Sequence, residues 1–173
     1  YGLVGNNEFE EAFLDEGLNT YSSAKVVEVA YRDNCPYPRP FGVPVLLEPW
    51  FTIPAPPFPF AGVGGIPMGE YFSCTQYGEA SGMRPGYLHH AEDDEIAHNG
   101  WQYLSGASYG VNSYSRTALT LYTLENYLGM ETMARVMRTY HQRWRYRHPT
   151  LKDFIETVNV VSGRNMDWFF QQF

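Results

Sequence analysis

A carboxylate stands in the apolar stripe of the first helical segment. Residues 8–32 contain few helix breakers, and their apolar side chains recur at the spacings that form one face of a helix. At about 100° per residue, Glu16 falls inside this stripe. Such a carboxylate is costly unless it is paired, protonated or bound to a metal. The stripe consists of Phe9, Phe13, Thr20, Ala24, Val27 and Tyr31.

Glu16 has an ordinary interpretation as well as a chemical one. It could pair with an arginine or lie in a hydrated gap, since buried carboxylates are more often paired than bound to a metal. A catalytic zinc site takes about three protein ligands, so one glutamate does not define such a site. The helix by itself leaves both interpretations open.

Two further clusters have side chains capable of chemistry. His89, His90 and His98 flank an acidic run at residues 92–95. Adjacent histidines do not easily face one ion, and the spacing fits no zinc motif, so we expect a solvated surface there. The arginine-rich stretch at residues 143–148 could bind an anion, but a solvated or internally paired face is the simpler expectation.

The elements that must position these residues are predicted to be helices. Residues 8–32 form the first, and Asn112 or Ser113 caps a second that ends at Gly129. A third begins at Glu131 and is stopped by Pro149. Further helices are expected at 150–163, where Thr150 and Asp153 resemble a capping box, and at 166–173. The fold class is therefore predicted to be an all-α helical bundle.

Residues 34–67 are rich in proline and glycine and cannot form a regular helix. Because several aromatic side chains lie among the prolines, we expect an ordered loop packed onto the helices, with a mobile insertion as the alternative. Residues 69–111 are expected to be irregular with short elements. The whole chain, residues 1–173, is predicted to be a single domain.

Composition limits the classes of function. The chain has 173 residues and a net charge of −7, which makes nucleic acid a poor candidate partner. No apolar run approaches the ~20 residues of a membrane span. Cys35 and Cys74 lack the spacing of a zinc motif and could pair or stay free.

A specific resemblance enters at residues 7–17, which read Asn-Glu-Phe-Glu-Glu-Ala-Phe-Leu-Asp-Glu-Gly. This run resembles the segment that follows the H-E-x-x-H motif in the aminopeptidase N family of gluzincin zinc metallopeptidases. In that family the two histidines of the motif and a downstream glutamate in this context hold the zinc. The resemblance implies that Glu16 is the third ligand. The second histidine would lie a few positions before Tyr1, so we expect the chain to be a piece of a longer protein.

A second match lies downstream, in residues 113–119, Ser-Tyr-Ser-Arg-Thr-Ala-Leu. It resembles the family's Tyr-x-Lys-Gly-Ala segment and implies that Tyr114 is the catalytic tyrosine that stabilises the oxyanion. Arg116 and Thr117 depart from the pattern, because they stand where the family commonly has Lys and Gly, and Thr117 is expected to alter helix packing. The resemblance covers about residues 1–33 and 98–173.

The implied protein is the C-terminal part of a thermolysin-like catalytic domain that hydrolyses peptides by a zinc-activated water. Asp15 is implied to orient a metal ligand, although a solvent-exposed acid is the simpler interpretation. The segment that binds a peptide's free amino terminus in the family would lie upstream, so exopeptidase activity follows only by analogy. We expect residues 1–173 alone to hold zinc weakly and to be inactive.

Other functions remain open on the sequence. The main alternative is a non-catalytic helical domain that binds peptides or proteins, and a weaker one is an aromatic-lined carbohydrate-binding protein. The enzyme requires Glu16 and Tyr114 to face one open cleft, whereas a binding module would bury or expose them apart. We also expect an exposed apolar groove along the first helix, through which the chain self-associates.

Overall fold

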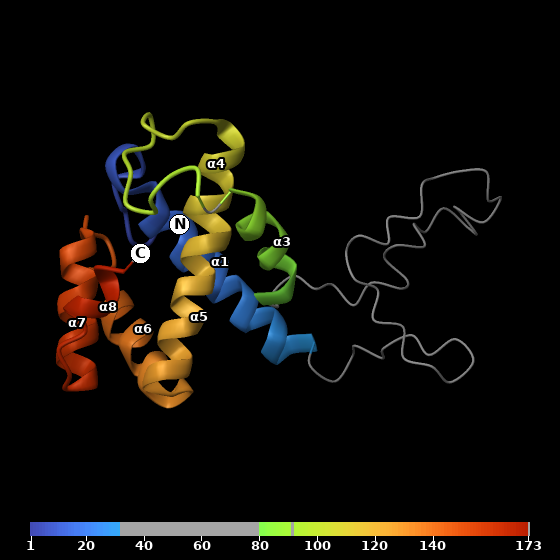
Figure 1. The fold of residues 1–173 in the computed structure, drawn as a ribbon. Coiled ribbons are helices and arrows are strands. Elements are labelled where there is room, and N and C mark those ends of the chain that lie inside the picture. Colours follow the sequence, from blue (N-terminus) through green and yellow to red (C-terminus); the bar gives the residue numbers. More distant parts are fainter. Residues whose placement is uncertain (32–79, 91, 173) are drawn as a thin grey trace, which may run out of the picture. The chain divides into compact units, whose positions relative to one another are not determined.

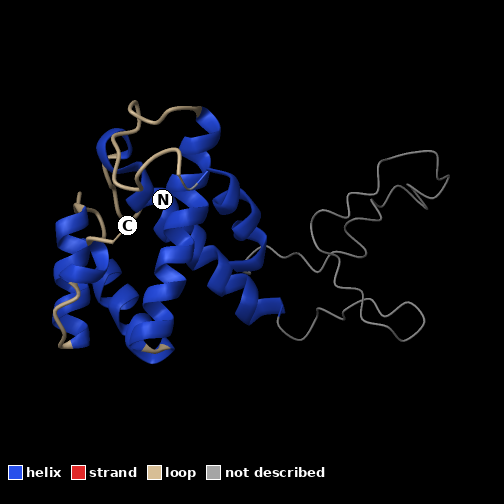
Figure 2. Cartoon of the chain, in the orientation of Figure 1, coloured by secondary structure: helices blue, strands red, loops and turns tan. Residues whose placement is uncertain are grey.

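The computed structural model describes residues 1–31, 80–90 and 92–172, and every regular element in those ranges is a helix (Figures 1 and 2). The all-α prediction is therefore confirmed for the described residues. The elements are α1 (Glu8–Tyr31), α3 (Ala80–His90), α4 (Gly106–Gly110), the π-helix η2 (Val111–Arg116), α5 (Thr117–Leu128), α6 (Met130–Trp144), α7 (Leu151–Ser162) and α8 (Asp167–Phe170).

The chain divides into two compact units, one of residues 1–22 and 83–173 and one of residues 23–82. In the second unit only the end of α1 and the first residues of α3 are described. The proline-rich insertion at 34–67 and both cysteines lie outside the described residues, so the expectations about them stay predictions. No helix in the described ranges is long and apolar enough to cross a bilayer.

The last third of the chain is helical, as predicted, and it supplies much of the core of the first unit. On α6, Met133, Val136 and Tyr140 are buried, while the exposed faces carry the arginines. The helix ends at Trp144 rather than running on to Pro149, because the backbone of Arg145 leaves the helical region (φ −57°, ψ 135°). The remaining core side chains include Leu121, Leu124, Phe154, Val158, Met166 and Phe169.

The boundaries of α7 follow directly from the sequence signals. The side chain of Asp153 accepts a hydrogen bond from the Thr150 amide at 2.8 Å, and the two residues form the predicted capping box. These hydrogen bonds hold the pKa of Asp153 below its ordinary value. At the other end, Gly163 takes the left-handed conformation (φ +67°) that ends many helices. Gly129 separates α5 from α6 in a different conformation with positive φ (φ +87°, ψ 144°).

The central run of helix before Gly129 begins earlier than predicted. Ser105 caps α4 by accepting the amide of Ser108 at 3.1 Å, and the chain then continues through η2 into α5. Asn112 and Ser113 are fully buried inside η2, so the prediction that one of them caps a helix is wrong. The sequence did not predict this earlier helix start, because Gly106 and Gly110 lie in it and glycine ordinarily disfavours a helix interior.

Within this unit, α1 is most deeply buried at residues 12–18. Each residue of this segment is buried. The predicted apolar stripe is wrong at its first member, because Phe9 is 76% exposed. Phe13 and Leu14 instead pack into the core cluster. A small apolar pocket of about 60 Å³ lies beside Phe13, Leu14 and Leu18 of this helix. The wider apolar groove and self-association through it stay predictions.

α1 approaches the start of α5 so closely that one position must be glycine. A Cβ placed on Gly17 would lie 2.1 Å from Cγ2 of Thr117 and 2.5 Å from its Cβ. Both distances are far below normal carbon–carbon contacts. Thr117 stands where the resemblance would place a glycine. Its side chain fits in the structure because the facing residue, Gly17, has no side chain. Thr117 is fixed in turn by donating its hydroxyl to the carbonyl of Asn112 at 2.8 Å.

Gly17→Ala should therefore destabilise the chain strongly. We expect a loss of at least about 2 kcal/mol in the free energy of unfolding, measured by urea denaturation, because the methyl group overlaps Thr117. Adding Thr117→Gly should recover part of this loss by removing the clashing atoms. The matched control is Gly110→Ala, since a Cβ there meets nothing within 4 Å. Equal stability of the two alanine variants would contradict the close approach.

Candidate functional site

The structure brings together the two residues that the sequence placed in one site. The hydroxyl of Tyr114 donates to Oε1 of Glu16 at 2.5 Å, although the two residues are 98 positions apart. The hydroxyl of Tyr1 donates to the other oxygen, Oε2. Glu16 is only 8% exposed, so its carboxylate is buried with both oxygens hydrogen-bonded. An arginine partner, one of the ordinary interpretations of Glu16, is not among these contacts.

Glu16 and Tyr114 lie close together because the helices that carry them, α1 and η2, approach each other there. Glu16 precedes Gly17, where α1 makes its close approach, and Tyr114 precedes Thr117 by three positions in η2. The π-helix adds a residue to the turn, and such segments occur often at functional sites. The contact between Gly17 and Thr117 thus places the neighbouring carboxylate and phenol within hydrogen-bond distance.

The phenols around Glu16 are held in their protonated form. Burial, followed by the hydrogen bond and the negative charge of Glu16, raises the pKa of both Tyr114 and Tyr1 above the ordinary value. Burial and the charge of Glu16 also raise the pKa of Tyr109, whose ring centroid lies 6.5 Å from that of Tyr114. At neutral pH these hydroxyls are therefore hydrogen-bond donors rather than phenolates.

Asp15 is buried, and its interpretation as a solvent-exposed acid is wrong. It is 5% exposed, and its Oδ2 has no hydrogen-bond partner among the described residues. Burial raises the pKa of Asp15 to about 6, and the charges of Glu8 and Glu16 raise it further while the Tyr1 amino group opposes them. An unpartnered buried carboxylate oxygen is uncommon and costly. Whether Asp15 orients a metal ligand stays a prediction.

Two of the neighbouring residues were not found from the sequence. Tyr1 and Tyr109 both belong to the surroundings of Glu16, yet neither lies in the motifs that carry the family resemblance. Tyr109 could have been found only with knowledge of the π-helix, in which residues five apart share a face. Tyr1 is brought to the site by the irregular chain ahead of α1, which has no periodic signal.

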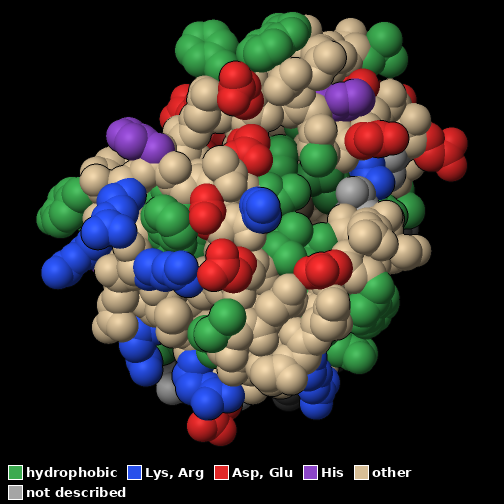
Figure 3. All heavy atoms as spheres, turned by 90° about the vertical axis from the view of Figure 1, so that its left-hand side faces the viewer, with side chains coloured by type: hydrophobic (Ala, Val, Ile, Leu, Met, Phe, Trp, Pro, Cys, Tyr) green, Lys and Arg blue, Asp and Glu red, His purple; other side chains and the backbone are tan. Residues whose placement is uncertain are grey.

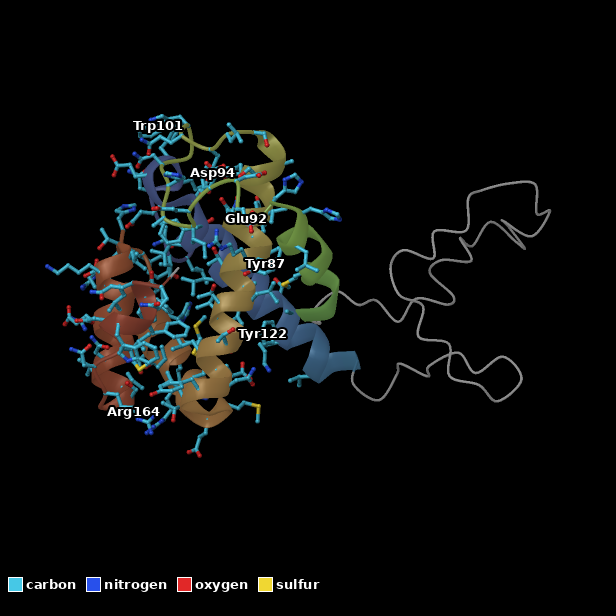
Figure 4. All side chains as sticks on the ribbon, viewed as in Figure 1. Tyr87, Glu92, Asp94, Trp101, Tyr122 and Arg164 are labelled. Atoms are coloured by element: carbon cyan, nitrogen blue, oxygen red, sulfur yellow. The ribbon has the colours of Figure 1, made fainter. Side chains whose placement is uncertain are left out.

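Arg116, the cation of the second motif, ties η2 to the loop that precedes α4. Its Nη1 donates to the carbonyl of Asp94 at 2.7 Å and to Oδ1 of Asn112 at 3.1 Å. The Asp94 carboxylate accepts the Leu104 amide and the Ser108 hydroxyl, which lower the pKa of Asp94. Figure 4 labels Asp94 in this loop, beneath Trp101. Arg116 therefore anchors the segment that carries Tyr114.

The described residues do not by themselves fit a catalytic zinc ion. No three histidine, cysteine, aspartate or glutamate side chains converge in the described ranges, so Glu16 would be a single ligand. The histidines discounted as a metal cluster form separate pairs. His90 contacts Asp93 at 2.8 Å, and His98 lies 3.7 Å from Asp94.

A cleft of about 520 Å³ opens at the start of α1, away from the Glu16 carboxylate. Its lining includes Glu10, Glu11 and His148 and does not include Glu16 or Tyr114. Glu11 is already engaged there, since its Oε1 accepts the Leu151 amide at 3.1 Å. The cleft and the Glu16–Tyr114 pair are therefore separate features of the same unit. The enzyme would require Glu16 to face an open cleft, but Glu16 is buried and does not face this one.

No family model, curated protein or solved structure matches this chain. The resemblance to the aminopeptidase N family is carried by the motifs around Glu16 and Tyr114, and it stays a prediction.

The buried Asp15 carboxyl should make stability depend on pH. Its pKa is 3.8 when exposed and about 6 in the fold, so the folded chain binds more protons between these values, and stability falls as pH rises through them. We expect Asp15→Asn to raise the free energy of unfolding by up to about 3 kcal/mol at pH 7.5 and to have little effect at pH 3.5. Urea denaturation at both pH values measures this.

The matched control for Asp15→Asn is Glu92→Gln, which removes an exposed carboxylate and should change stability by less than about 0.5 kcal/mol at either pH. If Asp15→Asn destabilised the chain equally at both pH values, the carboxylate would be making a favourable contact, and its costly burial would be contradicted.

Proposed function

We propose that this chain supplies one ligand and the oxyanion donor of a zinc metallopeptidase site resembling that of the aminopeptidase N family. The observation that carries the proposal is the 2.5 Å hydrogen bond between Tyr114 and Glu16. The resemblance, which rests on two short sequence motifs, assigns these two residues to one site. A chance similarity of two such motifs gives no reason for residues 98 positions apart to touch.

The chemistry of these side chains suits the proposed roles. A carboxylate oxygen is an accepted zinc ligand. The Tyr114 hydroxyl can donate a hydrogen bond, which suits it to stabilise an oxygen that gains negative charge during peptide hydrolysis. The two remaining ligands are proposed to be histidines of a segment ahead of Tyr1.

One observation favours a non-catalytic helical domain that binds peptides or proteins. Both oxygens of Glu16 accept hydrogen bonds from phenols of this same chain, so the carboxylate is satisfied without a metal. A buried and satisfied carboxylate is also what a purely structural role produces. The two functions are separated by experiment on a form of the protein that is extended ahead of Tyr1.

In the extended protein we expect one bound zinc and chelator-sensitive hydrolysis of aminoacyl anilides. Glu16→Ala should abolish tight zinc binding, measured by metal analysis after dialysis, because it removes a ligand. Tyr114→Phe should retain the zinc but lower kcat by about 10²–10³-fold, because a transition-state hydrogen bond is lost. The matched control is Tyr109→Phe, which removes a neighbouring phenol whose hydroxyl does not donate to Glu16 and should change kcat only a few-fold.

Residues 1–173 alone provide the second control. They are expected to bind zinc weakly and to show no chelator-sensitive hydrolysis, because the described residues hold no three converging ligands. Activity of this chain by itself would contradict the proposed division of ligands. An extended protein that is metal-free and inert would favour the peptide-binding domain instead.

A further inference from the structure

Charge is distributed unevenly along the chain. Residues 130–173 carry seven Lys or Arg and four Asp or Glu, a net charge of +3, whereas residues 1–129 carry five and fifteen, a net charge of −10. In Figure 3, Lys and Arg side chains gather along the left edge and the bottom of the molecule. An acidic protein with one basic face presents that face to negatively charged partners.

Four arginines on and after α6 are not neutralised by the described residues. Arg135, Arg138, Arg145 and Arg147 are exposed and have no ion pair within the described ranges. Two other arginines of this region are engaged. Arg143 lies 3.4 Å from Glu156, and Arg164 lies over the ring of Tyr127.

Helical spacing places three of these arginines along one side of α6. Arg135 and Arg138 are three residues apart on α6, and Arg145 follows seven positions later, directly after the helix ends. Ten residues of helix span about 15 Å. That length equals about five residues of an extended peptide.

A strained and exposed tyrosine directly follows Arg145. Tyr146 has φ +63°, the left-handed conformation that a bulky residue rarely adopts, and its side chain is 76% exposed. Its ring makes no hydrogen bond or ring contact within the described residues. No contact of its ring with the described residues explains why this position is tyrosine rather than glycine, and such strain is common at binding sites.

The turn that presents Tyr146 is fixed by its backbone. The amide of Tyr146 donates to the carbonyl of Leu3 at 2.5 Å, and Gly5 donates to the carbonyl of Arg147 at 2.9 Å. The amide of Arg147 donates in turn to the carbonyl of Trp144 at 3.0 Å. These backbone hydrogen bonds hold the turn that carries Tyr146 between Arg145 and Arg147.

We propose that this surface, which consists of Arg135, Arg138, Arg145, Tyr146 and Arg147, binds an extended acidic segment of a partner protein. Guanidinium groups match carboxylates in paired hydrogen bonds. A rigid aromatic residue between arginines has the composition of an interface hot spot. The fixed turn favours a peptide over a membrane, because a lipid surface needs no such geometry, and the acidic remainder of the chain opposes a long nucleic acid.

The proposal does not depend on zinc or on the Glu16–Tyr114 pair, so either proposal can fail while the other stands. A labelled ten-residue peptide of nine glutamates and one central leucine serves as the probe, titrated by fluorescence anisotropy at two salt concentrations. We expect saturable binding that weakens as salt rises.

Variants of the chain test the named residues. Arg145→Glu should weaken peptide binding at least about tenfold, whereas Lys152→Glu, the same charge reversal on an exposed lysine of α7, should weaken it less than about threefold. Tyr146→Gly relieves the left-handed backbone, so it should leave the Tm equal or higher while weakening binding at least about fivefold. A tighter-binding or unaffected Tyr146→Gly variant would overturn the role of the tyrosine.

Competing ligands complete the test. Vesicles of phosphatidylserine and phosphatidylcholine and a twelve-nucleotide single-stranded DNA should bind more weakly than the acidic peptide, and their binding should be insensitive to Tyr146→Gly. Tighter binding of either ligand, or equal loss of peptide binding in Arg145→Glu and Lys152→Glu, would overturn the proposal.

Discussion

The close approach of α1 to the start of α5 sets the geometry on which the candidate site depends. Gly17 and Thr117 meet where a Cβ on the glycine would lie 2.1 Å from the threonine side chain. Because helices at this distance cannot shift without a clash, the residues next to the contact are placed firmly. Glu16 and Tyr114 are those residues, and they are joined by a hydrogen bond. The close helix contact at Gly17 and Thr117 and the Glu16–Tyr114 hydrogen bond therefore lie at the same helix crossing.

The same crossing buries charge that an apolar core would ordinarily exclude. Asp15 and Glu16 lie side by side on α1 and are both nearly inaccessible to solvent. Two phenols donate hydrogen bonds to Glu16, whereas Asp15 has an oxygen with no partner in the described part of the chain and a pKa of about 6. Buried carboxylates lower the stability of the fold, and they are typical of functional sites, where ionisable groups with shifted pKa values take part in chemistry. They are the physical reason to treat this crossing as a site.

The sequence predicted most clearly what depends on local rules. The ends of α7 follow from its capping box and from Gly163, and the buried line of α6 follows from helical periodicity. The family motifs also predicted that Glu16 and Tyr114 belong together. What was missed depends on tertiary packing: the exposure of Phe9, the burial of Asp15 and the π-helix around Tyr114. No periodic pattern encodes these features, because they arise only when separate segments meet.

The most direct test of this account is a double-mutant cycle between Glu16→Ala and Tyr114→Phe, with the free energy of unfolding of the chain measured in urea. A charge-assisted hydrogen bond contributes about 1.5–3 kcal/mol, so we predict a favourable coupling energy of at least about 1 kcal/mol between the two residues at neutral pH. If the two effects were additive within about 0.5 kcal/mol, the residues would not interact, and the common site would be contradicted.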